Sequence, residues 1–327
     1  MIGIFKQKSP GNIVILLIFG LLIKLPLFLF PRSVALTEQD GSLYRFLVTA
    51  TGSGNILLFS AISFTLLYLQ ALQVNYLVNE YRMITRPNYL AGMAYMLITS
   101  FLPEWSYLSA PLVANTLIIW MFTSLFRLYS LGNIRPQVYN IGLIAGVCSY
   151  IYFPSACFAF CALLGLLILR PFRLNEIVLF LLGCLTPYYF YGLYLFLTDG
   201  LNFSRFLPRI SVSIPALKSS LQLAGAALLL AIPFLMGGFF IQNHLRKMLI
   251  QVRKNWSILL LYLLLAFFVP FVNGNSTLHA WVLVAAPFAA FHACAYFYQP
   301  KIFLSSLLFF IAAGYVIFLQ FGTPTWH

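Results

Sequence analysis

"NIVILLIFGLLIKLPLFLF", residues 12–30, opens a series of long apolar runs, and "ALTEQDGSLYRFL", residues 35–47, is the polar stretch that follows it. A bilayer core of about 30 Å needs about 20 helical residues to cross it. Residues 12–30 have that length and contain a single charged residue, Lys24. The run therefore predicts a membrane-spanning helix, and the polar stretch predicts a loop at one membrane surface.

The whole chain is as apolar as this first run. Its 327 residues are 62% hydrophobic and 8% charged, whereas soluble domains carry about 25% charged residues. Only helices and closed barrels satisfy every backbone hydrogen-bonding group within a bilayer. Barrel strands alternate between apolar and polar residues, but the apolar runs here are continuous. The composition predicts an all-α, polytopic bundle of transmembrane helices that forms a single domain over residues 1–327.

The same length criterion, applied along the chain, predicts about eleven spans. They cover residues 12–30, 55–77, 88–103, 108–126, 138–153, 155–169, 175–197, 219–241, 257–273, 279–297 and 303–321. The shortest include 88–103, 138–153 and 155–169. The pairs 88–126 and 138–169 are expected to form helical hairpins bent at Pro103 and Pro154, or segments that re-enter the membrane in part.

The basic residues predict an orientation. Lys and Arg concentrate in the cytoplasmic loops of membrane proteins. With the N-terminus in the cytoplasm, thirteen of the 19 basic residues fall on the cytoplasmic side, five fall on the outer side, and Lys24 lies within the first span. This bias accounts for most of the net charge of +13, so we expect no nucleic-acid partner.

Motifs of soluble enzymes and of metal sites do not occur in the sequence. It contains no HExxH, GxSxG or Walker-type loop. All five cysteines lie in apolar spans, as expected of small buried side chains. Cys157 and Cys161 are four residues apart, but no His, Asp or Glu accompanies them as a further metal ligand. We therefore expect neither a metal ion nor a cofactor.

The few acidic residues fall mainly in the predicted outer loops. Of the six in the chain, those on the outer side are Glu38, Asp40, Glu104 and Asp199. They can be ordinary solvated loop residues, because acids have little influence on topology. They can also be catalytic, because a positioned carboxylate accepts a proton from an attacking hydroxyl.

The positions of two of these acids resemble the GT-C class of membrane glycosyltransferases. In that class an acid just after the first helix, followed by an aromatic residue, works on the acceptor, and a second acid often lies between helices three and four. Asp40 with Tyr44 matches the first position, and Glu104 in "LPEWSY" matches the second. Residues 150–194 resemble mid-chain helices of the class. The chain also resembles a family of multipass inner-membrane proteins from Bacteroidota.

The resemblance implies transfer of a sugar from a polyprenyl-phosphate donor to an acceptor, at the extracytoplasmic face of a bacterial inner membrane. It implies that Asp40 is the general base and that Glu38 or Glu104 orients the acceptor, with Tyr44 contacting the substrate. The lipid-linked sugar donor and membrane lipids are the implied partners.

A cation beside the departing lipid phosphate would lower the barrier. Arg205 and Arg209, four residues apart, and Lys218 are the candidate phosphate ligands on the outer side. The same stretch mixes apolar and basic residues, so it can instead lie at the membrane interface. Lys24 either extends toward the surface or lines the same cavity.

Two other functions are compatible with the composition. One is a non-enzymatic subunit of an envelope complex, with envelope proteins as partners. The other is a transporter or flippase of lipids or small molecules. A transporter is expected to place ionisable groups near the bilayer midplane, and apart from Lys24 the polar residues within the spans are mainly amides such as Asn75 and Asn115.

Overall fold

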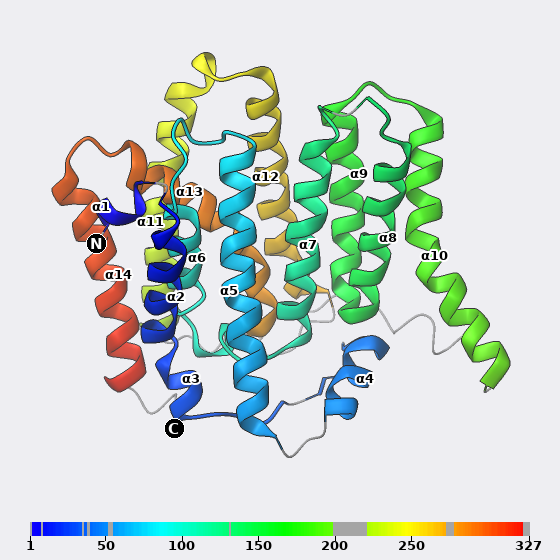
Figure 1. Cartoon of the computed structure of the whole chain (residues 1–327), viewed down its shortest axis with the longest axis horizontal. Coiled ribbons are helices and arrows are strands. Elements are labelled where there is room, and N and C mark those ends of the chain that lie inside the picture. The colour runs from blue at the N-terminus through cyan, green and yellow to red at the C-terminus, as the bar shows by residue number, and fades with distance from the viewer. Residues whose placement is uncertain are drawn as a thin grey trace.

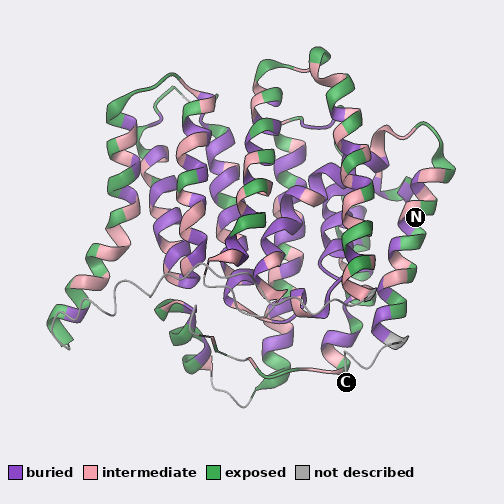
Figure 2. Ribbon diagram, turned by 180° about the vertical axis from the view of Figure 1, so that it is seen from behind, coloured by how far each residue is buried: buried purple, intermediate pink, exposed green. Residues whose placement is uncertain are grey.

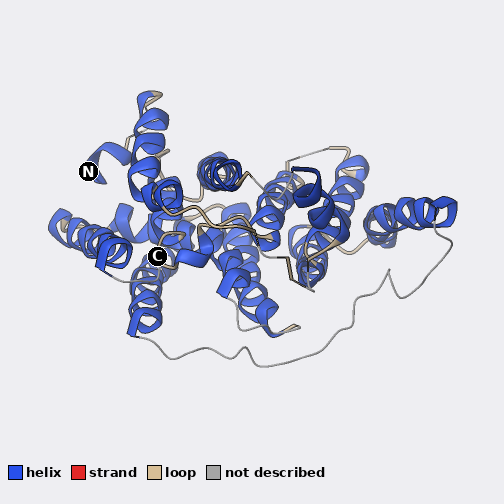
Figure 3. Cartoon of the chain, turned by 90° about the horizontal axis from the view of Figure 1, so that it is seen from below, coloured by secondary structure: helices blue, strands red, loops and turns tan. Residues whose placement is uncertain are grey.

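The computed structural model describes residues 2–7, 9–34, 36–37, 40–51, 55–130, 132–198, 221–272 and 278–322. These residues are mainly helical, and the extended pairing among them is one isolated antiparallel bridge between Asp40 and Tyr152. The helices pack side by side and the turns gather at two opposite ends (Figures 1 and 3). The predicted all-α bundle is therefore confirmed.

Helices occupy all eleven predicted segments. The first contains α2 (Gly11–Ile23) and α3 (Leu25–Leu29), and the others contain α5 (Ile56–Glu80), α6 (Leu90–Ile98), α7 (Ala110–Arg127), α8 (Arg135–Ile151), α9 (Cys157–Leu169), α10 (Leu174–Thr198), α11 (Leu221–His244), α12 (Ile250–Phe268), α13 (Ala285–Tyr298) and α14 (Ile302–Gly322). Two short helices lie outside these segments, namely α1 (Ile2–Phe5) and α4 (Ser42–Thr51). Short 3₁₀ turns are η1 (Pro103–Trp105), η2 (Phe153–Ala156), η4 (Leu245–Lys247), η5 (Val269–Phe271) and η6 (Leu278–Val284).

Among the described residues, seven helical segments are long and apolar enough to cross a membrane. They are Ile56–Glu80, Ala110–Arg127, Leu174–Thr198, Gln222–Lys247, Ile250–Phe271, Leu278–Tyr298 and Ile302–Gln320. By contrast α6 has 9 residues, which span about 14 Å at 1.5 Å per residue, less than half of a bilayer core. The structure therefore supports a membrane protein with seven candidate crossings, and the count of eleven stays a prediction.

The first predicted span is broken at Lys24. Pro26 lacks an N–H and its ring clashes with the preceding helical turn, so α2 and α3 meet at Lys24. Lys24 is fully buried, and its Nζ donates to the Thr99 carbonyl oxygen at 2.7 Å and to Ser106 Oγ at 2.8 Å. The side chain therefore points into the protein and does not extend to the surface.

Buried residues fill the middle of the bundle, and exposed ones cover its outside (Figure 2). A polar network joins four of the central helices. Asn115 of α7 donates to the Tyr95 hydroxyl of α6 at 3.0 Å and accepts from the Tyr262 hydroxyl of α12 at 3.0 Å. Gln70 of α5 accepts from the Tyr95 hydroxyl and donates to the Leu112 carbonyl oxygen at 2.7 Å. Leaving such a buried group unpaired costs about 1–3 kcal/mol, so the network fixes how these helices align.

Helices α8 and α10 approach each other backbone to backbone. Gly142 and Gly146 of α8 form a GxxxG pattern, which lets two helices come close. A Cβ atom added to Gly142 would lie 2.2 Å from the Phe180 carbonyl oxygen, and one added to Gly183 would lie 2.3 Å from the Tyr139 carbonyl oxygen. Any side chain at either glycine would push the two helices apart.

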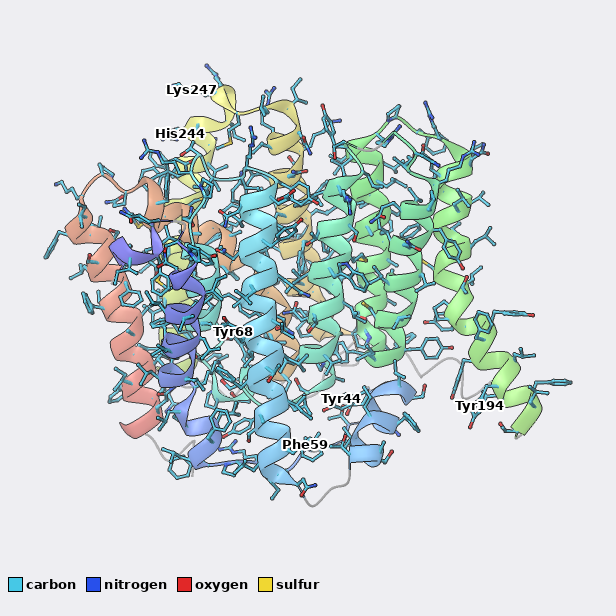
Figure 4. All side chains as sticks on the ribbon, viewed as in Figure 1. Tyr44, Phe59, Tyr68, Tyr194, His244 and Lys247 are labelled. Atoms are coloured by element: carbon cyan, nitrogen blue, oxygen red, sulfur yellow. The ribbon has the colours of Figure 1, made fainter. Side chains whose placement is uncertain are left out.

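The two ends of the bundle differ. Tyr44 and Phe59 lie at one end, and His244 and Lys247 lie at the other (Figure 4). The turns over residues 30–34, 40–41, 99–109 and 152–156 lie at the first end, here named the Asp40 end (Figure 1). The turns over residues 81–89, 170–173 and 245–249 lie at the second end, here named the Arg173 end (Figure 1).

Candidate functional site

A pocket at the Asp40 end brings together two of the acids singled out in the sequence. Asp40 and Glu104 both line a cavity of about 250 Å³, near the lower limit of small-molecule sites, which hold about 300–1,000 Å³. The described residues that line it are Arg32, Ser33, Thr37, Asp40, Glu104, Tyr107, Leu108, Ser109, Ala110, Pro111, Tyr152, Pro270, His279 and Ala280. Four separate stretches of chain thus meet at one cavity.

The Asp40 carboxylate is held by a turn of its own loop. Its Oδ2 accepts the Thr37 N–H at 2.6 Å, and the Asp40 N–H donates to the Thr37 carbonyl oxygen at 3.2 Å. Arg45 closes the turn, because Nε donates to the Asp40 carbonyl oxygen at 3.1 Å and Nη2 donates to that of Thr37 at 2.8 Å. The Thr37 side chain contributes a further hydrogen bond to this carboxylate, which also lines the pocket.

Gly41 seats this turn against the end of α8. Its N–H donates to the Ile151 carbonyl oxygen at 2.9 Å, next to the bridge between Asp40 and Tyr152. A Cβ atom at position 41 would lie 1.7 Å from the Tyr150 carbonyl oxygen, which no side chain tolerates. The glycine therefore allows the loop to carry Asp40 to the pocket wall.

Burial changes the acid–base behaviour of Asp40. The residue is 8% exposed, and desolvation raises the pKa of its carboxyl group above the usual value. The hydrogen bond from Thr37 and the nearby Arg45 and His279 lower the pKa, but the net direction is upward. A carboxylate with a raised pKa is a stronger base near neutral pH than an ordinary aspartate.

Glu104 presents an unpaired carboxylate oxygen to the same region. It lies in η1, directly after Pro103. Its Oε2 is buried and has no hydrogen-bond partner among the residues that the structure describes. Because a buried acceptor without a donor is costly, this atom marks a position where a bound hydroxyl or amide would donate a hydrogen bond.

His279 is a pocket residue that the sequence analysis did not single out. Its Nδ1 lies 2.8 Å from the Glu104 carbonyl oxygen. A carbonyl only accepts, so Nδ1 carries the hydrogen. Trp105 Nε1 donates to the Leu278 carbonyl oxygen at 2.9 Å. Each of the turns η1 and η6 therefore donates a side-chain hydrogen bond to a backbone carbonyl oxygen of the other. The predicted orientation contains a signal for His279, because it places the loop between the spans 257–273 and 279–297 on the outer side.

Arg32 supplies a cation to the pocket. Its guanidinium lies 4.9 Å from the centroid of the Tyr107 ring, and the residue is exposed. Guanidinium groups suit phosphate because they donate to two of its oxygens at once. Four other residues expected from the sequence to bind phosphate or orient the acceptor lie outside the described part of the chain, namely Arg205, Arg209, Lys218 and Glu38.

Tyr44 lies near Asp40 but does not line the pocket. It projects from α4 at the Asp40 end (Figure 4) and is 1% exposed. Its hydroxyl group has no hydrogen-bond partner among the described residues. Burial and the neighbouring Asp40 charge raise the pKa of Tyr44, so the hydroxyl stays protonated. Contact between Tyr44 and a substrate stays a prediction.

The pocket thus gathers two carboxylates, an imidazole and a guanidinium in one small cavity. Across the described ranges, no three His, Cys, Asp or Glu side chains cluster in a way that could hold a metal ion. Comparisons with family models, curated proteins and solved structures found no match for this chain.

Proposed function

We propose that this chain is a membrane glycosyltransferase of the GT-C type. It transfers a sugar from a polyprenyl-phosphate donor to a hydroxyl acceptor at the extracytoplasmic face of a bacterial inner membrane. In this proposal the chain crosses the membrane eleven times, the N-terminus is cytoplasmic, and the Asp40 end faces outward. The observation that supports it most is that Asp40 and Glu104, from two separate loops, line one pocket together with Arg32.

The proposed reaction assigns a task to each group. The acceptor hydroxyl binds with its O–H directed at the Asp40 carboxylate. Its oxygen attacks the anomeric carbon of the donor sugar, its proton passes to Asp40, and the bond from the anomeric carbon to the phosphate oxygen breaks. The electron pair of that bond leaves with the lipid phosphate. Arg32 stabilises the charge that the phosphate gains.

Two further groups orient the acceptor in this proposal. Glu104 Oε2, which is buried and unpaired among the described residues, accepts a hydrogen bond from a second acceptor hydroxyl. His279 Nε2 accepts another, because Nδ1 is committed to the Glu104 carbonyl oxygen. Such positioning contributes to rate by holding the reacting atoms in line. Glu38, Arg205, Arg209, Lys218 and Tyr44 keep the roles expected from the sequence as part of the proposal.

Replacing Asp40 by Asn tests the proposal. The variant is expressed in a strain whose own copy of the gene is deleted, and envelope glycans and glycolipids are quantified by mass spectrometry at matched protein levels. Loss of the general base should lower product formation by about 100-fold or more. Glu80→Gln is the control, because Glu80 is an exposed carboxylate at the Arg173 end, and it should keep full activity.

Full product formation by Asp40→Asn would exclude a catalytic role for this residue. If deletion of the gene removed a glycan and Asp40→Asn fully restored it, the chain would instead be a non-enzymatic subunit of an envelope complex. A transporter or flippase has less support, because Lys24, the ionisable group within the first run, is hydrogen-bonded to Thr99 and Ser106 inside the protein.

A further inference from the structure

A second polar cavity lies at the Arg173 end, opposite the pocket described above. It holds about 680 Å³ and its lining includes Arg135, Arg170, Arg173 and Glu176. It forms where α9 ends and where α8 and α10 begin. The close contact at Gly142 and Gly183 holds α8 and α10 together, so the walls of this cavity are fixed by helix packing.

The cavity carries excess positive charge. Three guanidinium groups face one carboxylate, that of Glu176, which is buried and lies 3.9 Å from Arg173 Nη1. The guanidinium groups of Arg135 and Arg170 make no hydrogen bond or ion pair with another described residue. Two guanidinium groups without partners, on one cavity, are suited to an anion with several oxygen atoms, above all a phosphate group.

The surroundings favour a lipid as the source of that phosphate. Phe172 and Leu174, beside the arginines, are 64% and 67% exposed, as expected of side chains that enter an acyl layer. Only 11% of the apolar window of α10 is buried in the protein, so most of this helix is available to lipid chains. Basic pockets between membrane helices bind anionic headgroups in this way.

We propose that this cavity binds the headgroup phosphate of an anionic phospholipid, with the acyl chains lying along the exposed side of α10. Arg135 and Arg170 bind the phosphate oxygens directly, and Glu176 positions the Arg173 side chain. The N-terminal ends of α8 and α10 add a smaller attraction for the same charge. This site is independent of the glycosyltransferase proposal, since it lies at the opposite end of the bundle.

Native mass spectrometry of the purified protein tests the site. The protein is offered phosphatidylglycerol or phosphatidylcholine with identical acyl chains. The wild-type protein should retain one phosphatidylglycerol with a preference of about tenfold or more. The combined variant Arg135→Gln, Arg170→Gln and Arg173→Gln should lose that preference. The matched control, Arg246→Gln, Lys247→Gln and Arg253→Gln, removes the same charge from exposed residues of the same end and should keep it.

Several results would overturn the proposal. Equal loss of preference in both triple variants would show a diffuse surface effect and no specific site. Binding of further phosphatidylglycerol molecules without saturation at one per protein would also show a diffuse surface effect. Displacement of phosphatidylglycerol by inorganic phosphate alone would assign the cavity to a soluble phosphate and not to a lipid. If the combined variant does not fold, Arg135→Gln and Arg170→Gln are measured singly, and unchanged preference in both overturns the site.

Discussion

Two adjacent residues determine the geometry of the proposed active site. Asp40 supplies a buried carboxylate. Gly41 has no side chain, and this lets the loop lie against α8. The dipeptide therefore combines the carboxylate with the close backbone approach that places it at the pocket. Arg45 adds a third element, because it bonds the turn and also lowers the pKa of the Asp40 carboxyl group.

The pH dependence of transfer should report on Asp40. Because burial raises its pKa, the rate should fall as pH decreases through a value above the ordinary aspartate pKa of about 3.9, where the base becomes protonated. Arg45→Met removes a charge that lowers this pKa, so the acidic limb of the kcat/KM profile should move to higher pH. Arg45→Lys keeps the charge and should shift it less. An acidic limb that stays in place in Arg45→Met would contradict this role of Arg45.

The glycine has its own test. Gly41→Ala places a Cβ 1.7 Å from the Tyr150 carbonyl oxygen, so the loop must move away from α8 and take Asp40 with it. A displacement of about 1 Å can lower the rate by about 100-fold. Transfer activity is measured beside Gly132→Ala, where an added Cβ meets no described atom within 4 Å. Wild-type activity in both variants would contradict the proposed role of Gly41.

Part of the site could be predicted from the sequence, namely the residues whose position depends only on which membrane surface their loop occupies. Asp40 and Glu104 could be assigned to one end because the alternation of spans sorts loops between two surfaces. His279 could not be paired with Glu104, because that contact joins residues 175 positions apart and arises from tertiary packing. The same holds for Arg32, whose position over Tyr107 depends on how two loops meet.

At the scale of elements, apolar length predicted where helices form but not where they break. The first run splits at Lys24, and the segment predicted over 88–103 yields only the 9 residues of α6. Every residue of α6 is buried, so protein and not lipid surrounds its ends, and the irregular backbone after it can be satisfied by groups such as Lys24. A length criterion cannot detect this, because it treats each segment as if it faced lipid.

The packing of α8 against α10 makes a prediction at this scale. Gly142→Ala forces a Cβ to within 2.2 Å of the Phe180 carbonyl oxygen, so the helices must separate. Such overpacking costs about 1–3 kcal/mol. Thermal unfolding of the purified variant should therefore occur at a lower temperature than that of the wild-type protein.

Gly314→Ala is the matched control for this change. Gly314 lies within α14, and a Cβ there meets no described atom within 4 Å. Alanine favours helix over glycine by about 1 kcal/mol, so this variant should be as stable as the wild-type protein or more stable. Equal destabilisation by both substitutions would show that the effect is not due to the α8–α10 contact.

At the scale of the whole molecule, the two ends carry different chemistry. The Asp40 end holds a small pocket lined by two carboxylates, and the Arg173 end holds a larger pocket dominated by arginines. This asymmetry matches an enzyme that works on one face of a membrane and is anchored by lipid at the other. Under the two proposals, a phosphate-bearing lipid binds at two sites, one catalytic and one structural.

A cryo-electron microscopy structure of the protein in lipid nanodiscs containing polyprenyl phosphate tests the central claim most directly. We expect density for the phosphate in the Asp40 pocket, within hydrogen-bonding distance of Arg32, with its chain leading into the membrane. Phosphate density confined to the Arg173 end, with the Asp40 pocket free of lipid, would contradict the assignment of that pocket as the active site.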